Sequence, residues 1–158
     1  MAMKFVIPLE LKFDFALGGW TSLFKGIMYA IREKYGASAV LEIFERAWKM
    51  DDRLKDFTNV ILKIFKIEEN DMEAITKWFD IWGEVVGQER TIIELSKTFS
   101  RVRASKCPWK TKPKDISEWC NIFTNIVYNT INPKATFEKP KSMCAGDPYC
   151  EFVSKIEE

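Results

Sequence analysis

The sequence predicts an α+β fold, an antiparallel sheet of about four strands with about five helices packed mainly on one of its faces. Apolar residues of 18–87 recur at steps of three and four, which is the spacing of one helix face. Those of 5–15 and 90–104 alternate with other residues, which is typical of a half-buried strand. The predicted order is strand, four helices, strand, helix and two strands, and such segregation favours helices on one side of a sheet.

Residues 5–15 predict the first strand. Large apolar side chains occupy every second position here: Phe5, Ile7, Leu9, Leu11, Phe13 and Phe15. Pro8 has no backbone N–H to donate, so we expect this strand at an edge of the sheet or bulged. Gly18 and Gly19 end it.

Four helices are predicted before residue 88. Gly36 and Gly87 are suited to end the first and the fourth, because glycine adopts the left-handed conformation found after helices. Asn70 and Glu73 resemble a capping pair that opens the fourth helix. Aromatic side chains on these faces are interpreted as core, since apolar residues at helical spacing pack inside. The expected ranges are about 20–35, 37–50, 54–65 and 70–86.

The remaining third predicts a strand, a helix and two strands. Residues 90–104 alternate, with a bulge or bend expected near Ser100 because the apolar side changes there. Asp115 and Glu118 resemble a second capping pair, before a helix that ends at Asn132 and Pro133. Short strands are expected over 135–140 and 150–156.

Length and composition predict one domain over residues 1–158. The chain has 158 residues, of which 47% are hydrophobic, enough for one core. No linker separates its parts, which are a strand (1–17), a helical part (18–87) and a strand-helix-strand-strand part (88–158) that holds the cysteines.

Charge and hydropathy narrow the class of partner. The 24 basic and 23 acidic residues give a net charge of +1, so there is no bulk electrostatic case for nucleic acid or an anionic membrane. No apolar run is long enough to cross a bilayer, and no export signal is evident. We therefore expect a cytoplasmic protein whose cysteines are reduced thiols, metal ligands or redox groups. The oligomeric state, including a homodimer, stays open.

The chain contains no histidine. This excludes Ser-His-Asp and Cys-His catalysis and every metal site that uses histidine. A catalyst here would depend on Cys, Asp, Glu, Lys, Arg or Tyr.

The four cysteines all lie in the last third of the chain, at Cys107, Cys120, Cys144 and Cys150. Four thiolates can hold zinc or an iron–sulfur cluster. The spacing contains no Cys-x2-Cys knuckle, so buried free thiols are the alternative. A disulfide between Cys144 and Cys150 requires the intervening turn to bring their Cα atoms within about 7 Å.

Cys120 is a candidate nucleophile because it lies near the expected start of a helix, where the helix dipole favours the thiolate. Its position on the apolar face has the opposite effect, because burial disfavours charge. Asp147, in the Gly-Asp-Pro turn, is a candidate proton acceptor. The alternative is a packed core cysteine.

Arg101 and Arg103 are candidate ligand-binding residues. They share one face of the expected strand and could hold a carboxylate through bidentate hydrogen bonds. A solvated strand face is the alternative. Trp119, Tyr128 and Asn132 are candidates to line the same pocket.

Four segments between Thr98 and Phe152 together form a known pattern. They are Arg101–Pro108, Glu118-Trp119-Cys120, Ile131-Asn132-Pro133 and Cys144–Phe152. The pattern resembles the L-2-amino-thiazoline-4-carboxylic acid hydrolase family. The ending Gly146-Asp147-Pro148-Tyr149-Cys150-Glu151-Phe152 is also similar to vinyl-4-reductase-like small-molecule-binding domains.

The resemblance implies a small-molecule pocket between helices and sheet. Cys107, Cys120 and Cys150 match the family's cysteine positions and Asp147 its Gly-Asp turn, whereas Cys144 is additional. The implied activity is hydrolysis of a C–N bond in a small cyclic amino-acid derivative, with Cys120 or Cys107 as nucleophile. A non-catalytic ligand or metal sensor is the alternative.

Overall fold

The computed structural model describes residues 8–111 and 114–157. The helices are α1 (Leu9–Tyr35), α2 (Ala37–Lys49), α3 (Arg53–Ile64), α4 (Met72–Val86) and α5 (Trp119–Ile131). The strands are β1 (Arg90–Leu95), β2 (Phe99–Ala104), β3 (Ala135–Lys141) and β4 (Cys150–Ile156). Short 3₁₀ turns cover Met50–Asp52, Lys114–Ile116 and Met143–Ala145.

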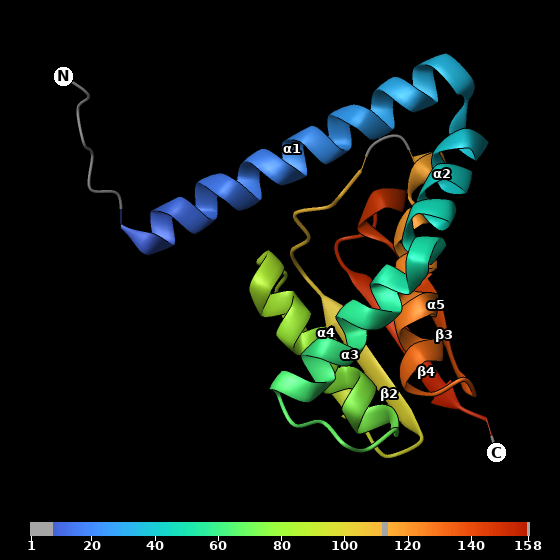
Figure 1. Ribbon diagram of the computed structural model, residues 1–158. Coiled ribbons are helices and arrows are strands. Elements are labelled where there is room, and N and C mark those ends of the chain that lie inside the picture. The colour runs from blue at the N-terminus through green and yellow to red at the C-terminus, as the bar shows by residue number, and fades with distance from the viewer. Residues whose placement is uncertain (1–7, 112–113, 158) are drawn as a thin grey trace.

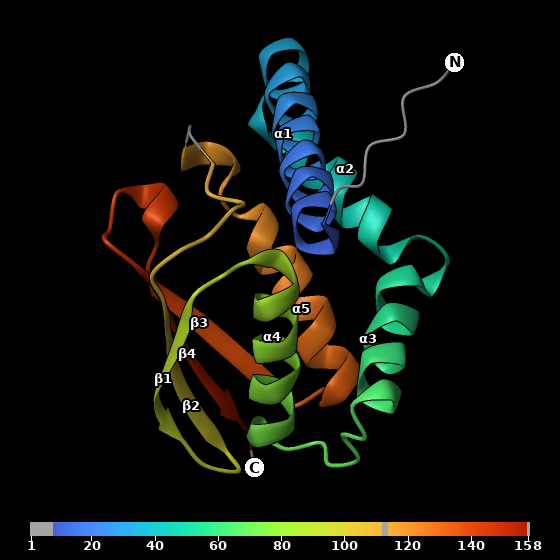
Figure 2. The ribbon, with the colours of Figure 1, turned by 90° about the vertical axis from the view of Figure 1, so that its left-hand side faces the viewer.

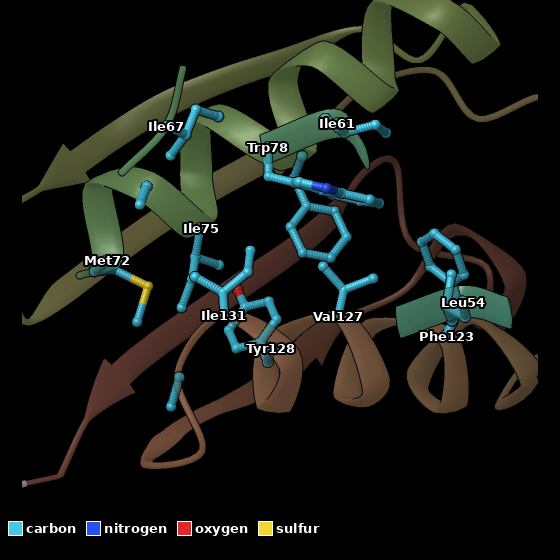
Figure 3. Packing of buried hydrophobic residues seen from close by; sticks show 13 residues of the cluster. Leu54, Ile61, Ile67, Met72, Ile75, Trp78, Phe123, Val127, Tyr128 and Ile131 are labelled. Carbon is cyan, nitrogen blue, oxygen red and sulfur yellow. The ribbon is translucent and has the colours of Figure 1, made fainter. Parts of the chain in front are cut away.

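The strands form one antiparallel sheet in the order β1-β2-β4-β3, which confirms the predicted fold class. Helices α4 and α5 lie on one face of this sheet, and α2 and α3 pack against α5 as an outer layer (Figures 1 and 2). The core lies where α3, α4 and α5 meet, and Trp78, Phe123 and Val127 point toward one another there (Figure 3). The Trp78 indole is fully buried, and its Nε1 donates to the Thr58 carbonyl at 3.3 Å.

The strand predicted over 5–15 is wrong from Leu9 onward, where α1 begins; residues 5–7 lie outside the described ranges. Alternation favours a strand only where a sheet covers the apolar side. Here Leu9 and Phe15 remain 79% and 69% exposed. Pro8 is compatible with a helix start, because its missing N–H would have no partner in the first turn.

The strand predicted over 90–104 is a hairpin of β1 and β2. Ser96 forms the turn: its N–H donates to the Phe99 carbonyl at 2.8 Å, and its Oγ accepts from the Phe99 N–H at 3.1 Å. The bulge lies between Ile92 and Glu94 instead of near Ser100. The sheet therefore has four strands because this segment supplies two of them.

Two helix starts differ from the predicted capping residues. Asp71 caps α4, its Oδ1 accepting from the Ala74 N–H at 3.0 Å, and Asn70 lies one residue earlier. Glu118 precedes α5 without a side-chain capping bond. Arg32 Nε and Nη2, which form one edge of the guanidinium, donate to the two oxygens of the Asp115 carboxylate at 2.9 and 2.7 Å, and this ties the end of α1 to the segment before α5.

Helix α1 projects beyond the other layers (Figure 1). Its C-terminal half packs through Met28 against Val40, Ile116 and Trp119. Its N-terminal half leaves large apolar side chains exposed, and Trp20 is 69% exposed. No helix among the described residues is long and apolar enough to cross a membrane.

Candidate functional site

A cavity of about 220 Å³ lies between helices and sheet. Large aromatic side chains from α2, α4, α5 and β4 dominate its wall. They include Trp48, Phe79, Trp82, Trp119, Phe123 and Phe152. An apolar interior of this kind favours an apolar ligand over a charged or strongly hydrated one.

The spacing of residues along α5 and along two strands of the sheet places many of the lining side chains on the cavity side. On α5, Trp119 and Phe123 lie four residues apart, and Cys120, Thr124 and Tyr128 follow one another at steps of four, so two neighbouring rows of the helix line the cavity. On the sheet, every second residue of two neighbouring strands lines it. These residues define the inner face of the sheet: Ser100 and Val102 of β2, with Cys150, Phe152 and Ser154 of β4.

The aromatic rings contact one another through edges and tilted faces, which is the favoured arrangement of such pairs. The Phe24 ring of α1 lies 5.0 Å from Trp109 and 5.1 Å from Trp119. Trp48 lies 5.5 Å from Phe123, measured between ring centroids. The wall is therefore held by mutual packing as well as by the elements that carry it.

A few polar groups face this apolar interior. The Tyr128 hydroxyl and Ser154 Oγ share a hydrogen bond of 2.7 Å, and burial raises the pKa of Tyr128. Arg90, at the start of β1, lines the cavity and donates from Nε to Asp80 Oδ1 at 2.9 Å. Such isolated polar groups fix the orientation of a ligand in an otherwise apolar pocket.

All four cysteines contribute to the cavity wall, but they are scattered over separate segments and do not form the predicted cluster. Each is a free thiol, so Cys144 and Cys150 are not joined. Cys144 Sγ accepts from the Thr111 N–H and Cys150 Sγ from the Met143 N–H, both at 3.3 Å. Among residues 8–111 and 114–157, no group of three or more Cys, Asp or Glu is placed to hold a metal ion. The zinc or iron–sulfur hypothesis therefore receives no support.

The thiols suggested as nucleophiles are protonated at neutral pH. Burial raises the pKa of Cys107 to about 11. Burial also raises the pKa of Cys120, although Lys139 Nζ lies 3.0 Å from its sulfur and partly offsets this. For Cys120, burial thus outweighs the stabilisation of the thiolate by Lys139.

Asp147 is not among the residues that line the cavity. Its Oδ2 accepts from the Ser142 N–H at 2.8 Å and closes the turn in which Gly146 has a φ of 106°. That conformation favours glycine. The carboxylate is thus engaged in holding the turn.

Arg101 and Arg103 alternate with Ser100 and Val102, so they lie on the sheet face opposite the inner face. Arg103 donates to Glu151 at 2.9 Å. The cavity gives no support to their role as ligand-binding residues, which stays a prediction.

Of the other predicted pocket residues, Trp119 and Tyr128 line the cavity and Asn132 does not. Asn132 Nδ2 donates to the Asn70 carbonyl at 2.7 Å, and its Oδ1 accepts from the Lys134 N–H at 2.9 Å. It joins the end of α5 to the segment before α4.

Sequence reasoning missed Arg90 and most of the aromatic wall. The wall residues were assigned to the core, and helical spacing alone cannot separate a core side chain from one that borders a cavity. Arg90 carried no motif. Its only signal was an arginine at the first position of a predicted strand.

Solved structures share this fold. A trafficking protein particle complex subunit 3 from Naegleria fowleri, determined covalently bound to palmitic acid, matches with a TM-score of 0.68 and 10% sequence identity. The match covers 92% of this chain and 97% of that chain. No family model and no curated protein matches the sequence. At this identity the likeness shows the fold.

The hydrolase prediction is wrong. The similar solved structure is a trafficking-complex subunit, and the expected parts of a C–N hydrolase do not come together. Cys107 and Cys120 are protonated thiols, and Asp147 lies outside the cavity wall. The resemblance to the thiazoline hydrolases and vinyl-4-reductase-like domains stays a prediction.

Proposed function

We propose that this protein is a non-catalytic binding protein for an elongated apolar small molecule, such as a fatty acyl chain. The observation that carries the proposal is the cavity of about 220 Å³ with its mainly aromatic wall. An apolar cavity of about 150 Å³ is enough to bind benzene. The space here therefore suits a ring or part of a flexible hydrocarbon chain.

The similar trafficking-complex subunit supports an acyl chain within this ligand class. That protein was determined with palmitic acid covalently bound, and it shares the present arrangement of helices on one sheet face. A saturated chain can adapt to an irregular wall of tilted rings, because each CH₂ group removed from water contributes about 0.8 kcal/mol wherever it lies.

The test is binding of dodecanol followed by tryptophan fluorescence. Four of the six tryptophans line the cavity, namely Trp48, Trp82, Trp109 and Trp119, so we expect a saturable change in emission. We also expect a higher melting temperature, since at a hundred times the Kd a ligand stabilises the native state by about 2.7 kcal/mol.

Thr124→Phe and Thr130→Phe form a matched pair on α5. Both hydroxyls bond the carbonyl four residues earlier, but only Thr124 lines the cavity. Thr124→Phe should weaken dodecanol binding at least tenfold by filling the cavity, and Thr130→Phe should bind as the wild type does. If Thr124→Phe does not fold, Thr124→Leu replaces it. Equal binding by all variants, or no saturable binding by the wild type, contradicts the proposal.

A second candidate function is that of a subunit in a protein assembly. The observation that favours it is the set of exposed apolar side chains along α1: Leu9, Leu11, Phe13, Phe15, Trp20, Leu23 and Ile27. Contiguous exposed apolar patches mark interaction sites in proteins. The similar solved structure is itself a complex subunit by name. The simplest partner is a second copy of this chain.

Self-association is measured by light scattering across a concentration series. The wild type should form dimers in the micromolar range. Phe15→Ser combined with Trp20→Ser should shift the chain to monomers, whereas Asp14→Ser on the same helix should not. A wild type that stays monomeric up to submillimolar concentration contradicts association through a second copy.

A further inference from the structure

We infer that the apolar ligand of this cavity carries a carboxylate and that Arg90 binds it. The inference rests on the proposed ligand-binding function and names the chemical class of the ligand. It is carried by the position of one buried arginine, by the donors that this arginine retains, and by the charges on its two sides.

Arg90 lies at the boundary between the cavity and the outside. It lines the cavity together with Phe79 and Tyr128. Its guanidinium carbon is 5.5 Å from the centre of the Phe79 ring, over the ring face, so the charged group lies beside a wall residue. The side chain is 11% exposed, and burial lowers the pKa of Arg90, although an arginine stays protonated near neutral pH.

The guanidinium is only partly engaged. Asp80 Oδ1 accepts from Nε at 2.9 Å, and Gln88 Oε1 accepts from Nη1 at 3.5 Å. Nη2 makes no hydrogen bond to any residue in the described ranges, where the bonds of this guanidinium come from Nε and Nη1. Because an arginine has five N–H donors, the edge formed by Nη1 and Nη2 remains suited to a bidentate carboxylate.

The two sides of Arg90 differ in charge. A surface depression on the outer side is lined by Asp80 and Glu84, which repel an anion. The cavity side presents aromatic rings, neutral polar groups and Lys110, and no carboxylate is among its described lining residues. In that low-dielectric interior the attraction between the guanidinium and a carboxylate is stronger than in water. An anion is therefore favoured on the cavity side.

Gly83 makes room for this arrangement. A Cβ at position 83 would lie 2.8 Å from Arg90 Cδ, so the arginine stem crosses α4 where a side chain is missing. This gives a way to displace Arg90 without removing it. Gly83→Ala adds one methyl group in a helix interior, where alanine is favoured over glycine.

The other cations near the cavity are less suited to this role. Lys110 lines it but its side chain is exposed, so water competes for any ion pair that it makes. Lys139 donates to Cys120 Sγ at 3.0 Å and is not among the lining residues. Among the residues that the structure describes, Arg90 is the cation that combines burial, unused donors and a place in the wall.

The experiment compares dodecanoate with dodecanol, which share the alkyl chain and differ in the carboxylate. Arg90→Met should weaken dodecanoate binding about ten- to a hundredfold, the range expected for a lost hydrogen bond to a charged group, and should leave dodecanol binding unchanged. Gly83→Ala should weaken dodecanoate selectively as well. Arg103→Met is the matched control, an ion-paired strand arginine on the opposite sheet face, and should bind both probes as the wild type does.

The outcomes separate this inference from the function on which it rests. If both probes bind and neither variant discriminates between them, the carboxylate assignment is overturned while apolar ligand binding stands. If neither probe binds to the wild type, the proposed function itself fails. If Arg90→Met does not fold because Asp80 loses its partner, the double variant that combines Asp80→Asn with Arg90→Met replaces it. The single variant Gly83→Ala then tests the carboxylate assignment independently.

Discussion

Burial decides the chemistry of individual cysteines. Cys107 and Cys120 border a largely apolar space, where burial raises the pKa of both thiols, and for Cys120 the nearby Lys139 ammonium offsets this only in part. The sequence showed the helix position of Cys120 but not how deeply its sulfur lies. Solvent exposure is a property of the assembled layers, so the reactivity of these thiols could not be read from their neighbours in the chain.

Cys107 should make the stability of the protein depend on pH in the alkaline range. Its folded pKa of about 11 lies above the value of about 8.5 for a free thiol. Its contribution is thus complete below about pH 8.5 and is lost as the pH rises toward 11. At about 1.4 kcal/mol per pKa unit, the free energy of unfolding should fall by about 2 to 3 kcal/mol over this window.

Cys107→Ser removes the titrating group and is the reference for this measurement. Denaturant unfolding of both proteins between pH 8 and 11 gives the slope of the free energy of unfolding against pH for each. The difference between the two slopes reports on Cys107, because the tyrosines and lysines that titrate in both chains cancel. Parallel curves would show that the Cys107 thiol ionises as readily in the folded state as in the unfolded chain.

Only some of the residues that line the cavity could be predicted from the sequence. Trp119 and Tyr128 both line the cavity from α5, and their role in binding a ligand stays a prediction. Arg101 and Arg103 were correctly expected to share a face, but which side of the sheet the helices cover is not encoded in one strand. Arg90 was missed because its partners, Asp80 and Phe79, come from a helix that precedes it in the chain.

At the level of elements, helix starts depend on a single residue. Asp71 accepts the Ala74 N–H and opens α4, and the Gly87 backbone, with a φ of 69°, closes it. The sequence placed this start one residue too early, since Asn and Asp are equally good caps and Asn70 and Asp71 are adjacent. Which of the two adjacent residues caps the helix depends on the backbone path that leads into α4, and the sequence does not show this path.

Asp71→Ala should lower the free energy of unfolding by about 1 kcal/mol, the usual cost of losing a helix cap. Asn70→Ala is its matched control: the contact of Asn70 with Asn132 uses the backbone carbonyl, which alanine retains. It should change stability by less than half as much. Urea denaturation of both variants measures the difference. An equal loss of unfolding free energy in both variants would contradict the assignment of Asp71 as the cap.

Helix α1 shows where periodicity is ambiguous. Its first residues alternate as a strand does, yet Leu, Lys, Glu and Ala are also strong helix formers. Without a sheet partner to cover one side, local preference for helix prevails. The opposite holds for residues 90–104, where alternation was correctly assigned to strand but the turn at Ser96 divides one expected strand into β1 and β2.

On the scale of the whole molecule, the fold class was predictable because it depends on totals and order. The strand wrongly predicted over 9–15 and the failure to divide 90–104 into two strands offset each other in the number of strands. The order of long helical and strand-rich stretches placed the helices on one sheet face, as observed (Figure 2). The cavity was not predictable in the same way, because α2, α4, α5 and the sheet leave it between them only after they pack.

Helix α1 belongs to two environments at once. Its Phe24 forms part of the cavity wall, while Phe15 and Trp20 are exposed on the same helix. The Arg32–Asp115 ion pair fastens the same helix to the segment that leads into α5. Any ligand that alters association by moving Phe24 must itself bind more tightly or more weakly, by the same factor, in the associated form. Ligand binding in the cavity and association through α1 would then share one coupling free energy, so that each changes the equilibrium constant of the other by the same factor.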